Sequence, residues 1–336
     1  MSALPTTHRE VRLTARPEGP LRPDHFHTAE VALPEPGPGQ VLVRNRLMAV
    51  AAIMDTVIRG ADGLPVPPAA PGAVPDGPAI GTVVAAPGTG LRPGDLVSHG
   101  RGWREYAVVD AADVERLDPG ALPDPAAHLS QGLIAWLGVV RGAAVRPGDT
   151  VLVTAAAGGV GSLAGQFARL RGATRVIGTT SSREKGHRLV AELGYDVAVT
   201  RDAGPVEDQL RAAAPDGVDA VVDNVGGDQL LAALAVARRG ARIGLIGSLA
   251  AQLSGSFAAP TRIDTGSLIL GGITLRGISG SDHLDAIPEW SREFGRALRD
   301  GTLVFPHTRL PGIDQAPRAL CELLAGRHVG AVLVEL

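Results

Sequence analysis

The feature that most constrains this chain is a glycine-rich turn between a short apolar segment and an amphipathic one. Residues 150–154 read Thr-Val-Leu-Val-Thr, which predicts a buried strand, and residues 161–170 have the helical spacing of apolar side chains. At such a turn Gly158 lets the backbone approach a pyrophosphate, and Gly161 lets the helix pack closely on the strand. An ordinary glycine-rich turn is the alternative. We predict that a dinucleotide binds to the turn residues Ala156, Gly158, Gly159, Val160 and Gly161.

The pattern on either side of this turn predicts the fold class. Strand-like and helix-like segments alternate from residue 150 to residue 246, and a sixth strand at 274–278 would complete a parallel sheet. Before about residue 120, short β-branched runs are separated by Pro and Gly, which is typical of a small antiparallel β-domain. The chain is therefore predicted to be α/β, with a β-domain at 1–128, a doubly wound parallel sheet at 129–300 and a return to the β-domain at 301–336.

The end of the second predicted strand, at 175–180, indicates which dinucleotide binds. Sites for NAD place an Asp or Glu there to accept hydrogen bonds from the ribose 2′-hydroxyl, and this sequence has neither. It offers hydroxyls and cations, which suit a 2′-phosphate. A solvated helix start, with Glu184 as its N-terminal charge, is the alternative. We predict NADPH as the cofactor, bound at this end by Thr180, Ser181, Ser182, Lys185 and Arg201.

Composition excludes several other classes of protein. The net charge of -3 provides no basic field for nucleic acid, and no apolar run approaches the length that spans a bilayer. The first residues lack a charged-then-apolar signal pattern, so we expect a cytoplasmic protein. Cys321 is the single cysteine, and the nine histidines lack ligand spacing, so we expect no metal site.

The motifs, taken in order, resemble the medium-chain dehydrogenase/reductase superfamily, and within it the zinc-independent branch of prostaglandin reductases and alkenal/one oxidoreductases. The resemblance covers nearly the whole length, and its specificity comes from the order and spacing of the pieces. They are PEPGPGQVLVR at 34–44, IRG at 58–60, GTVV at 81–84, RPGDLV at 92–97, GWREY at 102–106, GLIA at 132–135, PGDTVLV at 147–153, AAAGGVG at 155–161, DNVGG at 223–227 and GAVLV at 330–334.

The resemblance implies a GroES-like β-domain with a Rossmann domain inserted before its last segment. It also implies hydride transfer from NADPH to the β-carbon of an α,β-unsaturated carbonyl, and further cofactor contacts from Asn224, Gly247, Ser248 and His328. Relatives of this kind often dimerise by pairing edge strands. The edge strand here would be 274–278, which implies a homodimer through the Rossmann sheet.

Departures from the family pattern are concentrated on the substrate side. The expected tyrosine after the fifth strand is missing, and the chain reads Gly247-Ser-Leu-Ala-Ala-Gln252-Leu253 there. A developing enolate still needs a hydrogen-bond donor, and Gln252 is the aligned candidate, with Asp55, Ser279 or a ribose hydroxyl as alternatives. Met54 and Trp136 are interpreted either as the lining of an apolar pocket or as core.

These departures leave three hypotheses for the function. The leading hypothesis is an NADPH-dependent ene-reductase acting on a specialised metabolite. A reductive cyclase, in which hydride addition starts a ring closure, is a second hypothesis. A non-catalytic NADPH-binding protein, resembling the lens crystallins that are similar to quinone oxidoreductases, is the third.

Overall fold

The computed structural model describes residues 4–60, 69–254 and 260–336, which form two compact units. Of the described residues, the first unit contains 4–60, 69–130, 307–327 and 331–336, and the second contains 131–254, 260–306 and 328–330. The second unit thus extends beyond the expected end at 300. The Gln166 side chain explains this, because its Nε2 donates to the Val304 carbonyl at 3.0 Å and its Oε1 accepts from the Val304 amide at 2.8 Å.

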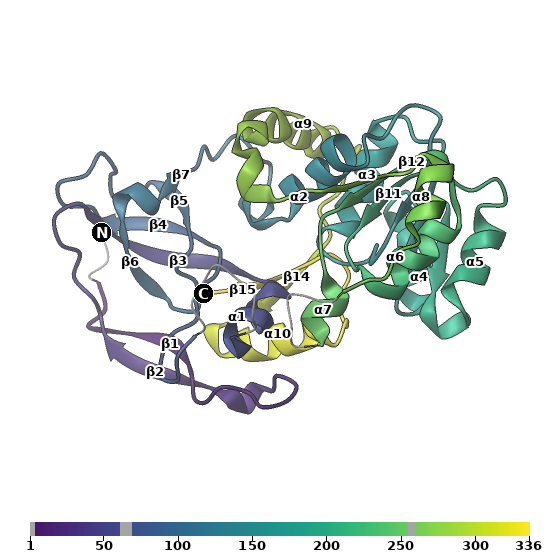
Figure 1. The fold of residues 1–336 in the computed structure, drawn as a ribbon. Helices are drawn as coiled ribbons and strands as arrows, with labels where there is room; N and C mark the ends of the chain where they lie inside the picture. Colours follow the sequence, from purple (N-terminus) through teal and green to yellow (C-terminus); the bar gives the residue numbers. More distant parts are fainter. Residues whose placement is uncertain (1–3, 61–68, 255–259) are drawn as a thin grey trace. The chain divides into compact units, whose positions relative to one another are not determined.

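The second unit is built on a six-stranded, wholly parallel sheet flanked by helices (Figure 1). The strand order is β10-β9-β8-β11-β12-β13, so the predicted sixth strand is confirmed and lies at an edge. The strands are β8 (Thr150–Val153), β9 (Arg175–Thr180), β10 (Val197–Thr200), β11 (Val218–Asp223), β12 (Ala237–Leu245) and β13 (Thr274–Gly277). The helices are α2 (Gly132–Leu137), α3 (Gly161–Leu170), α4 (Arg183–Glu192), α5 (Val206–Ala213), α6 (Gly227–Ala235), α7 (Leu249–Leu253), α8 (Thr265–Gly271) and α9 (Ile287–Arg299).

The apolar runs that predicted these strands form the core of the sheet. Leu152, Ile177, Val221 and Ile243 lie on four different strands and belong to one buried cluster. Helices that cover both faces of a parallel sheet bury its strands, which is why the strands have continuous rather than alternating apolar residues.

The first unit contains the predicted β-domain, with helices α1 (Ile53–Arg59) and α10 (Ala316–Leu324). Its seven-stranded sheet has the order β14-β15-β3-β4-β5-β7, with β6 also paired to β3, and β1 and β2 form a separate antiparallel pair. Only β14 and β15 of the seven-stranded sheet run parallel. The strands are β1 (Thr7–Leu13), β2 (Phe26–Ala32), β3 (Gln40–Val50), β4 (Ala79–Ala85), β5 (Leu96–His99), β6 (Tyr106–Asp110), β7 (Glu115–Arg116), β14 (His307–Pro311) and β15 (Ala331–Glu335).

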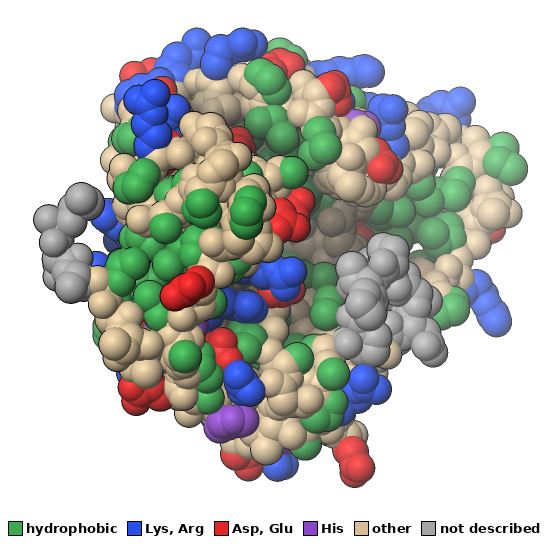
Figure 2. All heavy atoms as spheres, turned by 90° about the vertical axis from the view of Figure 1, so that its left-hand side faces the viewer, with side chains coloured by type: hydrophobic (Ala, Val, Ile, Leu, Met, Phe, Trp, Pro, Cys, Tyr) green, Lys and Arg blue, Asp and Glu red, His purple; other side chains and the backbone are tan. Residues whose placement is uncertain are grey.

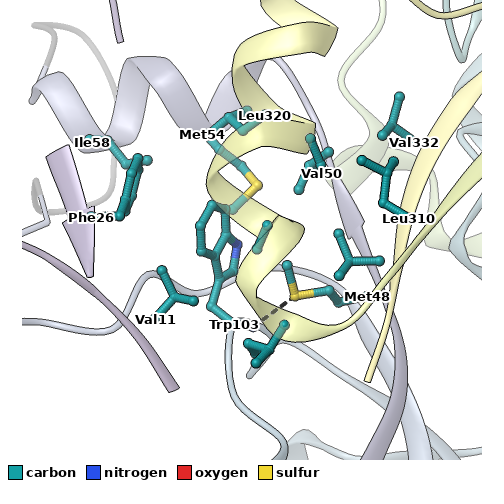
Figure 3. Packing of buried hydrophobic residues seen from close by; sticks show 14 of the residues in the cluster. Val11, Phe26, Met48, Val50, Met54, Ile58, Trp103, Leu310, Leu320 and Val332 are labelled. Atoms are coloured by element: carbon teal, nitrogen blue, oxygen red, sulfur yellow. Dashed lines mark hydrogen bonds between the residues drawn. The ribbon is translucent and has the colours of Figure 1, made fainter. Parts of the chain in front are cut away.

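Trp103 occupies the centre of the first unit's core (Figure 3). Its ring stacks on Phe26 with the centroids 5.3 Å apart, and its amide donates to the Met48 sulfur at 3.0 Å. Met54 belongs to the same cluster. Trp136 is buried in the second unit, where its indole N–H donates to Glu293 at 2.9 Å. Met54 and Trp136 are therefore both buried among residues of their own unit.

The surface agrees with the balanced composition. Acidic and basic side chains are interspersed over the face shown in Figure 2. None of the helices in the described residues is both long and apolar enough to cross a bilayer.

Candidate functional site

The glycine-rich turn joins β8 to α3, and its glycines serve different purposes. A Cβ on Gly161 would lie 2.4 Å from the Ala155 carbonyl oxygen and 2.6 Å from Ala156 Cα, so only glycine allows this approach of helix to turn. A Cβ on Gly158 would meet only the Ala155 oxygen, at 3.4 Å, and Gly158 is exposed. The chain's own packing therefore does not require a glycine at 158. An exposed backbone at this position fits the close approach of a pyrophosphate.

Two neighbouring segments fix the conformation of the turn. The Ala156 amide donates to the Thr179 carbonyl at 2.8 Å, and the Ala155 amide donates to the Thr179 hydroxyl at 3.2 Å. The Gly330 amide donates to the Ala157 carbonyl at 2.9 Å. The predicted residue His328 is thereby carried to the same side of the sheet as the turn, in the short segment 328–330 that belongs to the second unit.

Tyr195 supports the turn from beneath and was not expected from the sequence. Its buried hydroxyl donates to the Gly161 carbonyl at 2.6 Å. A Cβ on Gly165 would lie 2.3 Å from the tyrosine ring, and one on Gly178 would lie 2.8 Å from it. Burial raises the pKa of the Tyr195 phenol, so it remains a donor. A glycine inside a helix and one inside a strand were the available sequence signal for this close packing.

The end of β9 brings together the residues predicted for the 2′-phosphate. Thr180 is buried, and the Ser182 hydroxyl caps α4 by accepting from the Lys185 amide at 3.5 Å. Lys185 is half-buried, and among the described residues its ammonium has no hydrogen-bond or ion-pair partner. Burial lowers the pKa of Lys185, and the nearby charge of Arg201 lowers it further, although Glu184 opposes both. A phosphate group near the Lys185 ammonium would stabilise its charged form.

Asp202 is an acid that the sequence analysis missed at this end of the sheet. Its carboxylate accepts from the Arg183 amide at 3.2 Å, at the start of α4. The Thr200 hydroxyl is the main cause that lowers the pKa of Asp202, so the group is ionised at neutral pH. The predicted 2′-phosphate region therefore contains two carboxylates, Glu184 and Asp202, beside its cations.

The carboxyl ends of β11 and β12 place three further predicted residues together. Asn224 Nδ2 donates to the Thr154 carbonyl at 2.7 Å. A Cβ on Gly247 would lie 2.7 Å from the backbone carbonyl oxygen of Asn224. Ser248 Oγ is buried without a hydrogen-bond partner in the described structure. Asp223 lies beneath them and accepts from the Thr154 hydroxyl at 2.7 Å, while burial raises its pKa. Ligands of open parallel sheets bind at this edge.

The three candidates for catalysis are placed in different surroundings. Gln252 is half-buried on α7, which follows β12, and Ser279 follows the adjacent strand β13. Ser279 is exposed, and its Oγ lies 2.7 Å from the Ser281 hydroxyl. Asp55 belongs to the first unit, where it is 3% exposed and accepts from Arg59 Nε at 2.8 Å. Gln252 and Ser279 thus share a sheet edge with the turn, and Asp55 has an internal counter-charge.

The described residues contain no group of three or more His, Cys, Asp or Glu side chains that could hold a metal ion. His99 is satisfied internally. Its Nε2 pairs with Asn45 Oδ1 at 2.9 Å, and its Nδ1 accepts from the Arg101 amide at 3.0 Å.

Comparison with known proteins agrees with this arrangement. Residues 9–117 match a family described as the N-terminal domain of oxidoreductase, and residues 159–296 match one described as zinc-binding dehydrogenase. The chain is 30% identical to the “Putative NADP-dependent oxidoreductase YfmJ” of Bacillus subtilis, with 98% of each protein covered. It is 29% identical to the NADPH-dependent curcumin reductase of Escherichia coli, with 96% of this chain and 95% of that protein covered.

Two further proteins extend the comparison. The chain is 28% identical to an NADP(+)-dependent 2-alkenal reductase of Nicotiana tabacum, over 91% of this chain and 90% of that protein. The crystal structure of CurA from Vibrio vulnificus in complex with NADPH superposes with a TM-score of 0.88 at 26% identity, covering 97% of this chain and 98% of that one. The predictions of an oxidoreductase and of NADPH as its cofactor are confirmed. The chain belongs to the zinc-independent branch of the medium-chain dehydrogenase/reductase superfamily.

Proposed function

We propose that this enzyme uses NADPH to reduce the carbon–carbon double bond of an α,β-unsaturated carbonyl compound. The observation that carries the proposal is the pairing of an open turn at Gly158 with an unpartnered, half-buried Lys185 at the end of the next strand. Three of the relatives are named for NADPH or NADP(+), and two of those are named as reductases of curcumin and of a 2-alkenal.

When bound, NADPH would supply a hydride to the β-carbon, and water would supply the proton that the α-carbon takes up. The residues of the chain would bind and orient the reactants. Backbone N–H groups at the start of α3 would hold the pyrophosphate, and Lys185 and Arg201 would pair with the 2′-phosphate. The Gln252 amide would donate to the carbonyl oxygen as negative charge develops there, without giving up a proton. Asn224, Gly247, Ser248 and His328 would contact the rest of the cofactor.

We propose further that the substrate is a specialised metabolite rather than a general reactive enal. The support is the loss of the family's phenol, since Gln252 stands in its place and the only tyrosines of the chain are Tyr106 and Tyr195. Both are buried, and Tyr195 is used beneath the turn. A substrate side rebuilt in this way is expected for a changed substrate.

The exposed edge of the parallel sheet supports a homodimer. Among the described strands, β13 pairs with β12 alone. Helix α8, which packs on β12, presents Ile269 and Leu270 with exposed fractions of 78% and 76%. Unpaired strand edges and large exposed apolar side chains are common features of subunit interfaces. A second copy of this chain, paired along β13, would cover the strand edge and the two exposed apolar side chains. Light scattering of the wild-type protein and of Ile269→Asp would distinguish a dimer from a monomer.

NADPH oxidation against a panel of enones, enals and conjugated polyenones tests the proposed reaction. We expect turnover with at least one conjugated carbonyl compound and none with its saturated analogue. A product heavier by two hydrogens with unchanged ring connectivity supports reduction. The same mass with a new ring would favour the reductive cyclase, and binding of NADPH without any oxidation would favour the non-catalytic alternative.

A further inference from the structure

Gln131 places an unsatisfied polar atom against the glycine-rich turn. The residue directly precedes α2, and its side-chain oxygen Oε1 is buried without a hydrogen-bond partner in the described structure. A Cβ on Gly159 would lie 2.2 Å from that oxygen and 2.9 Å from the amide carbon Cδ. The absence of a side chain at 159 therefore makes room for the Gln131 amide.

Two other glutamines of the same unit have paired side-chain amides, whereas the Oε1 of Gln229 on α6 is, like that of Gln131, buried without a hydrogen-bond partner in the described structure. Gln166 uses Nε2 twice, toward Ser162 and Val304, and accepts from Val304 with Oε1. The Gln209 amide is likewise bonded to Thr200 through both its oxygen and its nitrogen. Buried polar atoms are nearly always paired, so an unpaired one beside a ligand site indicates a partner that arrives with the ligand.

The position of Gln131 limits which part of the cofactor could be that partner. Gly159 follows Gly158, the residue at which a dinucleotide-binding turn brings its backbone close to the pyrophosphate. The predicted contacts of the adenosine 2′-phosphate, Ser182 and Lys185, lie at the end of a different strand, β9. A primary amide carries both acceptor and donor atoms, and rotation about its last bond can present either.

We propose that Gln131 is a cofactor-binding residue whose amide hydrogen-bonds the nicotinamide-side phosphate and the adjoining ribose of NADPH. The contact does not involve the 2′-phosphate, so it contributes equally to NADPH and NADH. Lys185, in contrast, contributes to NADPH alone. This division holds whatever carbonyl compound the enzyme reduces, so a binding experiment tests it independently of the proposed reaction.

The experiment is a fluorescence titration of wild type, Gln131→Leu and Gln315→Leu with NADPH, NADH and adenosine 2′,5′-bisphosphate. The last ligand has the 2′-phosphate and the adenosine-side 5′-phosphate, but it lacks the nicotinamide-side phosphate and the nicotinamide ribose. Gln315 is a matched control, because it is also a partly buried glutamine directly before a helix, in the first unit. We expect Gln131→Leu to raise the Kd of NADPH and NADH about tenfold, the value of one hydrogen bond to a charged group.

Adenosine 2′,5′-bisphosphate should bind Gln131→Leu as it binds wild type, and Gln315→Leu should match wild type with all three ligands. An unchanged Kd for NADPH in a Gln131→Leu protein that melts normally would overturn the proposal, and so would equal weakening of the bisphosphate. If Gln131→Leu does not fold, Gln131→Glu provides the test. The glutamate carboxylate would repel the cofactor's phosphate and should weaken the binding of both NADPH and NADH. Wild-type affinity in this variant would also overturn the proposal.

Discussion

The glycine-rich turn of the second unit and helix α1 of the first both contain residues selected as site candidates, but the structure uses them differently. Around the turn, Lys185 and the side-chain oxygens of Gln131 and Ser248 have no partner among the described residues. On α1, Asp55 is matched by Arg59 four residues later. Unpaired groups at the carboxyl edge of the sheet are available to a ligand, whereas a buried ion pair already serves the fold. An unpaired atom alone does not mark a site, because the Thr56 hydroxyl on α1 is also buried without a partner in the described structure. If this difference holds, substitutions around the turn should change cofactor binding or catalysis, and substitutions on α1 should change stability.

Gln252→Ala should have the largest effect. Loss of the amide that stabilises the developing enolate should slow hydride transfer roughly ten- to a thousandfold and leave the Kd of NADPH nearly unchanged. Single-turnover absorbance of the nicotinamide measures both. If the loss appears only as weaker substrate binding, Gln252 shapes the pocket. An unchanged rate would transfer the role to Ser279 or Asp55.

His99 should make the first unit sensitive to acid. Burial is the main cause that lowers its pKa from 6.5 to about 4, so the unfolded chain binds a proton that the folded chain does not. The free energy of unfolding is therefore unaffected by protonation of His99 above pH 6.5. It decreases as the pH falls from 6.5 toward 4, by about 3 kcal/mol at most. Urea unfolding at several pH values measures it. His99→Gln should lose less stability than wild type over this interval, and an identical loss would contradict the assignment.

Lys185→Ala should weaken NADPH by about 1.5–3 kcal/mol, roughly ten- to a hundredfold in Kd, because a charge-assisted phosphate contact is lost. NADH should bind this variant as it binds wild type. Titration of both cofactors provides the measurement, and Lys185→Arg, which keeps the charge, should retain most of the preference. Equal affinities of wild type for NADPH and NADH would refute the role of Lys185.

The two ends of the glycine motif should respond in opposite ways. Gly161→Ala forces a Cβ into the Ala155 carbonyl and should cost about 1–3 kcal/mol of unfolding free energy. Gly158→Ala meets nothing closer than 3.4 Å and should melt normally, but its methyl group should hinder the pyrophosphate and weaken NADPH. Thermal melts and NADPH titrations of both variants separate the two roles. Equal destabilisation by both would show that Gly158 is also structural.

Asp55→Asn should have the smallest effect on function. It removes the counter-charge of the partly exposed Arg59, which should cost about 1–2 kcal/mol of stability. The hydride-transfer rate and the Kd of NADPH should remain at wild-type values. A stable Asp55→Asn variant with a lost rate would instead place Asp55 in catalysis, and the comparison between the two units would fail.

The sequence predicted the strand, glycine-rich turn and helix at 150–170 better than it predicted the residues that support the turn. Gly158 and Gly161 could be identified because their spacing fixes backbone geometry, which adjacent residues determine. Gln131 and Tyr195 could not, since each acts on the turn across about thirty residues of chain, and only the folded sheet brings them together.

The first unit shows the same limit. Asp55 was an alternative candidate for the enolate donor, and its partner Arg59 stands four residues later in the sequence. Helix α1 itself was not predicted, because residues 53–59 lie in a segment interpreted as part of a β-domain. Because the helix was not predicted, the sequence provided no reason to pair Asp55 with Arg59.

The most direct test of the account is the fate of the hydride. NADPH labelled with deuterium at C4 of the nicotinamide should be oxidised with a conjugated carbonyl substrate, and the product examined by NMR and mass spectrometry. We predict one deuterium at the β-carbon and an intact carbonyl group. Deuterium on the carbonyl carbon, with an alcohol as the product, would contradict conjugate reduction and indicate an alcohol dehydrogenase.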